Sequence, residues 1–106
     1  MARLQFEIVF APEVFGHLDF IKRRDHPLLK DTINRQLSFE PTLMSRNRKP
    51  LEQPAPFGAT WELRLGPQNC FRVFYEVDAA ARLVSVLAIG IKDRERLYVG
   101  GEEFKA

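Results

Sequence analysis

The stretch WELRLGPQNCFRVFYEV, residues 61–77, decides the fold. Apolar side chains alternate with other side chains on both sides of a Gly-Pro-Gln-Asn segment at residues 66–69. The alternating apolar residues are Trp61, Leu63, Leu65, Phe71, Val73, Tyr75 and Val77. A period of two is typical of strands with one buried face, and a short turn segment between two such strands indicates a β-hairpin. The stretch therefore predicts two antiparallel strands that share one apolar face.

A third strand is predicted directly after this hairpin. Residues 78–82 supply a second turn, and residues 83–91 are apolar at nearly every position, as expected of a central strand covered on both faces. The three strands then form an antiparallel meander. Residues 92–104 have mixed charge and contain a pair of glycines, so we interpret them as a loop or short turn at the end of the sheet.

Upstream of residue 60, the sequence predicts one more strand and two helices. Period-two alternation over about residues 3–10 indicates the strand. Apolar residues at helical spacing indicate a first helix from Pro12 to about residues 22–24, and a second one that ends near residues 39–40. Leu29, Ile33 and Leu37 form the apolar stripe of the second helix. Residues 41–58 are rich in proline and lack periodicity, which indicates a long basic connection.

The predicted element order is strand, helix, helix, strand, strand, strand. The first strand has to pair within the sheet, because its backbone N–H and C=O groups need partners. We therefore expect an α+β fold of order β-α-α-β-β-β, in which a helical hairpin packs on one face of an antiparallel sheet. A chain of 106 residues has the size of one domain, so residues 1–106 are treated as a single domain.

Composition excludes several classes of protein. The formal net charge is only +2, so a nucleic-acid site would have to come from how the cations are placed. Cys70 is the only cysteine, which excludes an internal disulfide and favours a reducing cytoplasm. The longest apolar stretch, residues 86–91, is too short to cross a bilayer, and the N-terminal residues lack the apolar core of a signal peptide. We expect a cytoplasmic protein with no membrane partner.

The polar face of the predicted hairpin carries cations. Since the apolar alternation faces the helices, Glu62 and Arg64 point away from them, and the turn brings Arg64 close to Arg72 on the same face. Lys92 follows at the end of the central strand. We call Arg64, Arg72 and Lys92 the cationic row. The proline-rich connection adds further cations, namely Arg46, Arg48 and Lys49.

Two interpretations of the cationic row are open. In the first, Glu62 and Glu76 pair with the arginines in a solvated network, as happens on many sheets. In the second, the converging cations bind a phosphodiester, and Phe74, on the same face as Arg72, stacks on a base. Phe74 is explained at least as well as an apolar residue that the tail covers.

Four motifs, in their order along the chain, resemble the RelE/ParE superfamily of type II toxin-antitoxin toxins. They are Lys-Pro-Leu at 49–51, Trp-Glu-Leu-Arg at 61–64, Phe-Arg-Val-Phe-Tyr at 71–75 and Ala-Ile-Gly-Ile-Lys-Asp-Arg at 88–94. Similarity to the RelE branch implies a ribosome-dependent endoribonuclease that cleaves mRNA through attack of the substrate's 2′-hydroxyl, without a metal or other cofactor. It also implies growth arrest through inhibited translation, and a cognate antitoxin whose acidic segment covers the basic face.

The resemblance implies roles for individual residues. Arg64 and Arg72 are expected to stabilise the phosphorane and Lys92 to serve the leaving 5′ oxygen, while Tyr98 stacks on the base or orients the 2′-hydroxyl. Glu62 stands where RelE-like members carry a lysine, so it is either the general base or a sign of impaired activity. The expected RNA-binding residues are Arg46, Arg48, Lys49, Phe74 and Arg94.

Other functions and residues remain to be weighed. His17 and His26 lie on the predicted helices, away from the sheet, and are expected to be surface or capping histidines. One alternative function is a ParE-like inhibitor that binds DNA gyrase and hydrolyses nothing. Another is an inactive member that only binds its antitoxin. The sequence does not determine the oligomeric state.

Overall fold

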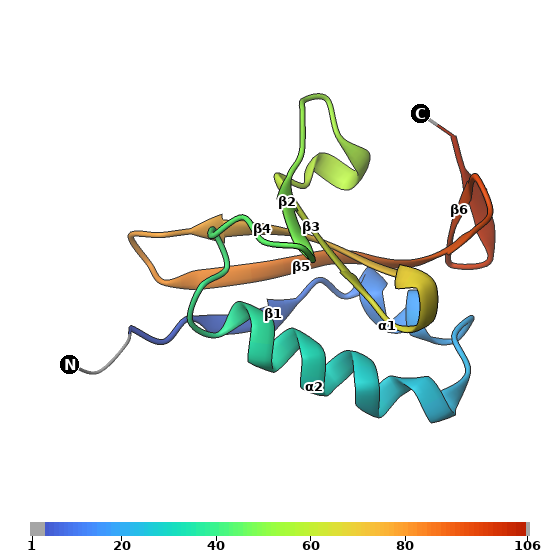
Figure 1. The fold of residues 1–106 in the computed structure, drawn as a ribbon, viewed down its shortest axis with the longest axis horizontal. Coiled ribbons are helices and arrows are strands. Elements are labelled where there is room, and N and C mark those ends of the chain that lie inside the picture. The colour runs from blue at the N-terminus through green and yellow to red at the C-terminus, as the bar shows by residue number, and fades with distance from the viewer. Residues whose placement is uncertain (1–3, 106) are drawn as a thin grey trace.

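The computed structural model describes residues 4–105, which contain two α-helices and seven strands. The helices are α1 (Glu13–Leu18) and α2 (His26–Leu37). The strands are β1 (Glu7–Phe10), β2 (Arg48–Pro50), β3 (Trp61–Leu65), β4 (Phe71–Asp78), β5 (Leu83–Asp93), β6 (Arg96–Val99) and β7 (Glu102–Phe104). Helix α2 lies along one side of the sheet (Figure 1). Within the described residues, no helix is long and apolar enough to cross a membrane.

The strands form one sheet in the order β2-β3-β4-β5-β6-β7, and β1 pairs with β5. Strands β3, β4 and β5 are the antiparallel meander that the sequence predicts. The predicted α+β fold and its element order are confirmed, with β2, β6 and β7 as additional strands. The expectation of a purely antiparallel sheet needs one correction, since β1 runs parallel to β5. Parallel pairing is possible here because two helices carry the chain across the sheet before the meander begins.

Two element boundaries at the N-terminal side differ from the prediction. Strand β1 begins at Glu7, since the N–H of Phe6 bonds to the Ser38 carbonyl (2.6 Å); residue 3 lies outside the described residues. Helix α1 ends at Leu18, several residues early, and a 3-10 turn occupies Arg23–Asp25. The ring of His26 donates from Nε2 to the carbonyls of Leu18 (3.0 Å) and Ile21 (2.9 Å). His26 is therefore a capping residue for the end of this helical segment, as expected.

Three short strands lie where the sequence predicted loops. Strand β2 is part of the proline-rich connection, and β6 and β7 form a hairpin from the tail. Gly100 and Gly101 make the turn between β6 and β7 with φ values of +62° and +80°. A two-residue hairpin turn of this kind needs positive φ at both positions, which glycine adopts at no steric cost. The sequence analysis took the glycine pair as a sign of a loop or short turn, and the structure shows that the pair joins two strands of a hairpin.

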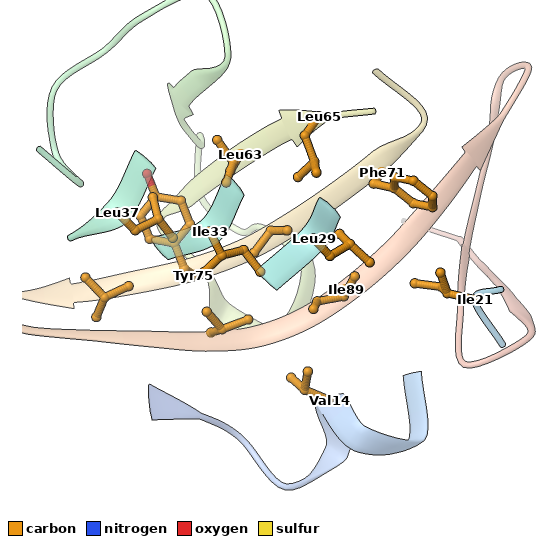
Figure 2. Packing of buried hydrophobic residues seen from close by; sticks show 13 residues of the cluster. Val14, Ile21, Leu29, Ile33, Leu37, Leu63, Leu65, Phe71, Tyr75 and Ile89 are labelled. Atoms are coloured by element: carbon orange, nitrogen blue, oxygen red, sulfur yellow. The ribbon is translucent and has the colours of Figure 1, made fainter. Parts of the chain in front are cut away.

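The main core lies between the helices and one face of the sheet (Figure 2). Its largest fully buried members include Leu29, Ile33 and Leu37 from α2, which confirms the predicted apolar stripe. Tyr75 packs beneath α2, and its hydroxyl donates to the Pro41 carbonyl at 2.7 Å. This bond satisfies a buried polar group and ties the segment after α2 to the centre of the sheet.

A smaller apolar cluster covers part of the other face, which is therefore less open than expected. Its buried members are Ala59, Phe74 and Ala88, and the partly buried residues packed on them are Leu51, Leu87, Leu97 and Val99. Strand β5 has a bulge at Leu87, because Phe74 pairs with Ala88 while Tyr75 pairs with Val86. The bulge shifts the alternation of β5, which explains why residues 83–91 read as apolar on both faces.

The buried stripe of α2 gives a first testable prediction. Ile33 is 1% exposed, so Ile33→Ala removes buried methyl groups and leaves a cavity, which lowers the free energy of unfolding by about 2–5 kcal/mol. Leu28→Ala on the same helix is the matched control, since Leu28 is 40% exposed and should cost less than about 1 kcal/mol. Urea denaturation of both variants measures the difference. Equal losses would contradict the assignment of the core.

Candidate functional site

Arg64 and Arg72 face each other across β3 and β4, on the sheet face opposite the main core. Residues on the core face, such as Leu63 and Val73, also pair directly, so the arginines occupy the alternate positions of both strands. The sequence prediction that the hairpin brings the two guanidinium groups together is confirmed. Like charges placed directly opposite are destabilising unless an anion joins them.

Glu62 supplies that anion within the protein. Arg64 Nε donates to Glu62 Oε1 at 2.7 Å, and Arg72 Nη1 lies 3.7 Å from Glu62 Oε2. Glu62 is 7% exposed, which makes it a buried carboxylate rather than part of a solvated surface network. The charge-pairing interpretation is thus correct for Glu62, whereas Glu76 lies further along β4, opposite Ser85, and is exposed.

Arg72 is held at a second point, next to the β3–β4 turn. Its Nε donates to the Asn69 carbonyl at 3.0 Å, and its side chain is only 11% exposed. Burial lowers the pKa of Arg72, and the neighbouring Glu62 opposes that shift. The guanidinium remains charged at neutral pH, because arginine loses its proton only far above that range.

Lys92 and Arg72 line the same groove, which has a volume of about 720 Å³. It is lined by Gln68, Cys70, Arg72, Ile91, Lys92, Asp93, Arg94 and Glu95. The N–H of Lys92 donates to the Cys70 carbonyl at 2.7 Å, which fixes the end of β5 beside the start of β4. Lys92 and Arg94 therefore join Arg72 along one groove. Asp93 and Glu95 reduce the net positive charge of its outer end.

Strand β2 and the residues just before it add cations to the sheet face that carries Arg64 and Arg72. Lys49 pairs with Glu62 and is exposed, while Arg46 is exposed just before the strand. Asn47, which sequence reasoning missed, holds the backbone of Arg64. The N–H of Arg64 donates to the Asn47 carbonyl (2.8 Å), and Asn47 Nδ2 donates to the Arg64 carbonyl (2.9 Å). The face thus carries cations from β2, β3, β4 and β5.

Comparison with known proteins gives a match among the solved structures. No family model matches the sequence, and no curated protein does. The crystal structure of the RelBE2 toxin-antitoxin complex from Mycobacterium tuberculosis contains a chain that superposes with a TM-score of 0.68 at 21% sequence identity. The match covers 86% of the present chain and 95% of that chain. The fold is RelE-like.

The RelE-like fold turns Arg48 away from the cationic row. Arg48 is 8% exposed and pairs with Leu63, on the side of the sheet where the helices pack. Its Nε donates to the Leu43 carbonyl (2.9 Å), and its Nη1 donates to the carbonyl and the side-chain oxygen of Gln36 (2.9 and 2.6 Å). The prediction that Arg48 binds RNA is wrong for this fold, because its donors hold the proline-rich connection to the end of α2.

Phe74 lies on the expected face but is only 2% exposed. The ring of Phe57, from the proline-rich connection, lies 6.1 Å from it, and Phe104 of β7 lies 5.0 Å from Phe57. The prediction that Phe74 stacks on a base is therefore wrong, and the competing explanation of a covered apolar residue is correct.

Tyr98 lies on the opposite face of this RelE-like sheet from the cationic row. It pairs with Ile91, which packs against the main core, whereas Lys92 pairs with Leu97. Tyr98 lines a small pocket of about 150 Å³ together with His17, Phe20, Ile21, Ile89, Ile91, Gly100 and Gly101. The prediction that Tyr98 joins Arg64 and Arg72 at one site is wrong, since a single-residue step along a strand reverses the face.

His17 contributes to the packing of α1 against the sheet, so the expectation of a surface or capping histidine away from the sheet is wrong for His17. Its Nδ1 accepts the N–H of Ile89 at 3.3 Å, and burial lowers the pKa of His17, with Glu13 opposing the shift. It lies outside the groove that contains Arg72 and Lys92. In the part of the chain that the structure describes, no group of three or more His, Cys, Asp or Glu residues could hold a metal ion.

The two arginines of the connection provide a matched pair for a stability test. Arg48→Ala removes a buried guanidinium that donates three hydrogen bonds, so we expect the free energy of unfolding to fall by about 1.5–3 kcal/mol. Arg46→Ala, two residues earlier, changes an exposed side chain and should stay within about 0.5 kcal/mol of the wild type. Chemical denaturation measures both. A neutral Arg48→Ala would show that the inward-facing contacts contribute nothing.

Proposed function

We propose that this chain is the toxin of a toxin-antitoxin module and that it cleaves mRNA in the decoding site of the ribosome. The observation that carries the proposal is the cationic row itself. Arg64 and Arg72 pair directly across β3 and β4, and Lys92 lines the groove beside Arg72, on the exposed side of a RelE-like sheet. Two guanidinium groups and one ammonium group that converge in this way fit a phosphodiester.

The proposed reaction uses the RNA's own 2′-hydroxyl as nucleophile. Its oxygen bonds to the adjacent phosphorus while the bond from phosphorus to the 5′ oxygen breaks, which gives a 2′,3′-cyclic phosphate and a free 5′-hydroxyl. The terminal amino groups of Arg64 and Arg72 neutralise the charge that grows on the phosphorane oxygens. Lys92 donates a proton to the leaving oxygen. A solvent water takes up the 2′ proton, because no cation of the row accepts it while charged.

The proposed partners follow from the same surface. Arg46, Lys49 and Arg94 are exposed around the cationic row and extend the positive surface along which an RNA backbone can bind. The RelBE2 structure is a toxin-antitoxin complex, which supports a cognate antitoxin for the present chain. An acidic antitoxin segment would neutralise the row and block the RNA. Such a module acts in the cytoplasm, where ribosomes and mRNA are found.

A ParE-like inhibitor of DNA gyrase is the second candidate function, and one observation favours it. Phe74 is buried and Tyr98 lies on the other face, so neither aromatic ring is available to stack on a base beside the cationic row. A protein that only binds needs no such ring. The inactive, antitoxin-binding alternative is favoured by Glu62, whose carboxylate already contacts both arginines.

Cleavage by programmed ribosomes tests the leading proposal. We expect Arg72→Ala to lower the rate of mRNA cleavage by about 10²–10³-fold, because it removes donors aimed at the phosphorane. Arg35→Ala is the matched control, since Arg35 is exposed on α2, on the other side of the sheet, and the rate should not change.

Other outcomes of this experiment select the alternatives. If the mRNA stays intact and DNA supercoiling is inhibited, the proposed cleavage is wrong and the protein is a gyrase inhibitor. Intact mRNA, normal supercoiling and tight antitoxin binding would identify the inactive member. Equal loss of cleavage in Arg72→Ala and Arg35→Ala would contradict the placement of the site on this face.

Tyr98→Phe provides a separate test of which face is catalytic. Because Tyr98 faces the main core, removal of its hydroxyl should leave the cleavage rate unchanged in the same assay. A general acid or base that touched the reacting atoms would instead lower the rate by about 10²-fold or more. A loss of that size, in a variant with wild-type stability, would contradict the placement of the reaction on the face that carries the cationic row.

A further inference from the structure

Glu62 is the buried acidic residue at the centre of the proposed site. It is 7% exposed and lies between two cross-strand neighbours, the exposed Lys49 on β2 and the buried Phe74 on β4. Along its own strand, Arg64 occupies the next position on the same face. The charged groups that face the carboxylate are therefore Lys49, Arg64 and Arg72.

The contacts of the carboxylate do not suit a general base. A base has to reach the proton that it withdraws, at a heavy-atom distance of about 2.6–3.2 Å. Oε1 of Glu62 already accepts from Arg64 Nε at 2.7 Å, and Oε2 lies towards Arg72 Nη1 at 3.7 Å. With so little of the residue exposed, both oxygens face arginines of the row rather than a substrate hydroxyl.

The same contacts suit a residue that orients arginines. Arg64 is anchored to Glu62 through Nε, and Arg72 is anchored to the Asn69 carbonyl through Nε. A guanidinium held at its Nε edge presents its terminal amino groups as a fork, which is the geometry that binds two oxygens of a phosphate. The carboxylate also offsets the repulsion between the two directly opposed cations.

We propose that Glu62 is a positioning residue, which holds Arg64 beside Arg72 so that both guanidinium groups present their terminal amino groups to one phosphate, and that it is not the base. This inference rests on the proposed phosphodiester chemistry of the cationic row. It assigns Glu62 an effect on the reaction only through the two arginines, because its carboxylate anchors Arg64 and its charge lies beside Arg72. The 2′ proton then leaves to solvent water and not to Glu62.

The distinction is tested by comparing Glu62→Gln with Glu62→Ala in the ribosome assay. Glutamine keeps an oxygen that accepts from Arg64 Nε, so the cleavage rate of Glu62→Gln should stay within about tenfold of the wild-type rate. Alanine keeps no acceptor, so the cleavage rate of Glu62→Ala should fall by about 10²-fold or more. If Glu62 were the base, both substitutions would lower the cleavage rate alike, by about 10²–10⁴-fold. Glu76→Gln is the matched control, because Glu76 is exposed, on the next strand, and outside the contacts of Arg64 and Arg72.

The pH profile adds a second readout. A positioning role predicts that Glu62→Gln keeps the wild-type shape of the profile of kcat/KM against pH. Loss of the acidic limb in this variant would make Glu62 the base and overturn the proposal, as would equal activities of Glu62→Gln and Glu62→Ala.

A measurement that needs no cleavage separates this inference from the proposed function. In ¹⁵N-labelled protein, the Nε–H signal of Arg64, assigned with Arg64→Lys, should keep its position in Glu62→Gln and move to that of a solvated arginine in Glu62→Ala. An unchanged signal in Glu62→Ala overturns the proposal whatever happens to mRNA. If this signal depends on Glu62 but the wild type cuts no mRNA, the proposed function fails and the anchoring of Arg64 stands.

Discussion

The pairing register of β3 and β4 is the constraint on which the rest of the molecule depends. Gly66 begins the turn between them. Glycine is required there for two reasons, since φ is +83° and a Cβ would lie 2.6 Å from the Phe71 ring. Five residue pairs follow, from Leu65 with Phe71 to Trp61 with Tyr75. A slip by one residue would exchange the two faces of a strand. The register therefore places Leu63 and Val73 in the core and the two arginines opposite it.

The guanidinium groups of Arg64 and Arg72 repel each other, and a carboxylate on one of the same two strands offsets this repulsion. Because side chains alternate, the residue two positions before Arg64 lies on the same face, and that residue is Glu62. The backbone supplies the other restraints, through the carbonyl of Asn69 for Arg72 and through Asn47 for the main chain of Arg64. The local order of the site thus comes from a turn, a strand edge and one carboxylate.

The sequence predicts those parts of the structure that depend on local spacing. Leu29, Ile33 and Leu37 repeat every four residues, so the buried face of α2 follows from the sequence alone, as do the meander and the shared face of Arg64 and Arg72. Strand β2 was missed because three residues containing a proline show no periodicity; only pairing with β3 makes them a strand. Arg48 was misplaced for the same reason. Its inward orientation depends on acceptors in residues 36 and 43, which the spacing of nearby residues does not reveal.

Tyr98 shows why a match in residue order does not by itself place a side chain at a site. Strands β5 and β6 are joined through Arg94 and Glu95, and this turn pairs Lys92 with Leu97. Tyr98 must then lie opposite Ile91 and face the core, however well its position along the chain agrees with a family pattern. The cationic row is then left with one buried carboxylate, Glu62, beside its two arginines. In the proposed function, cleavage differs from binding alone in the transfer of the 2′ proton, since the proposal assigns the phosphate itself to Arg64, Arg72 and Lys92.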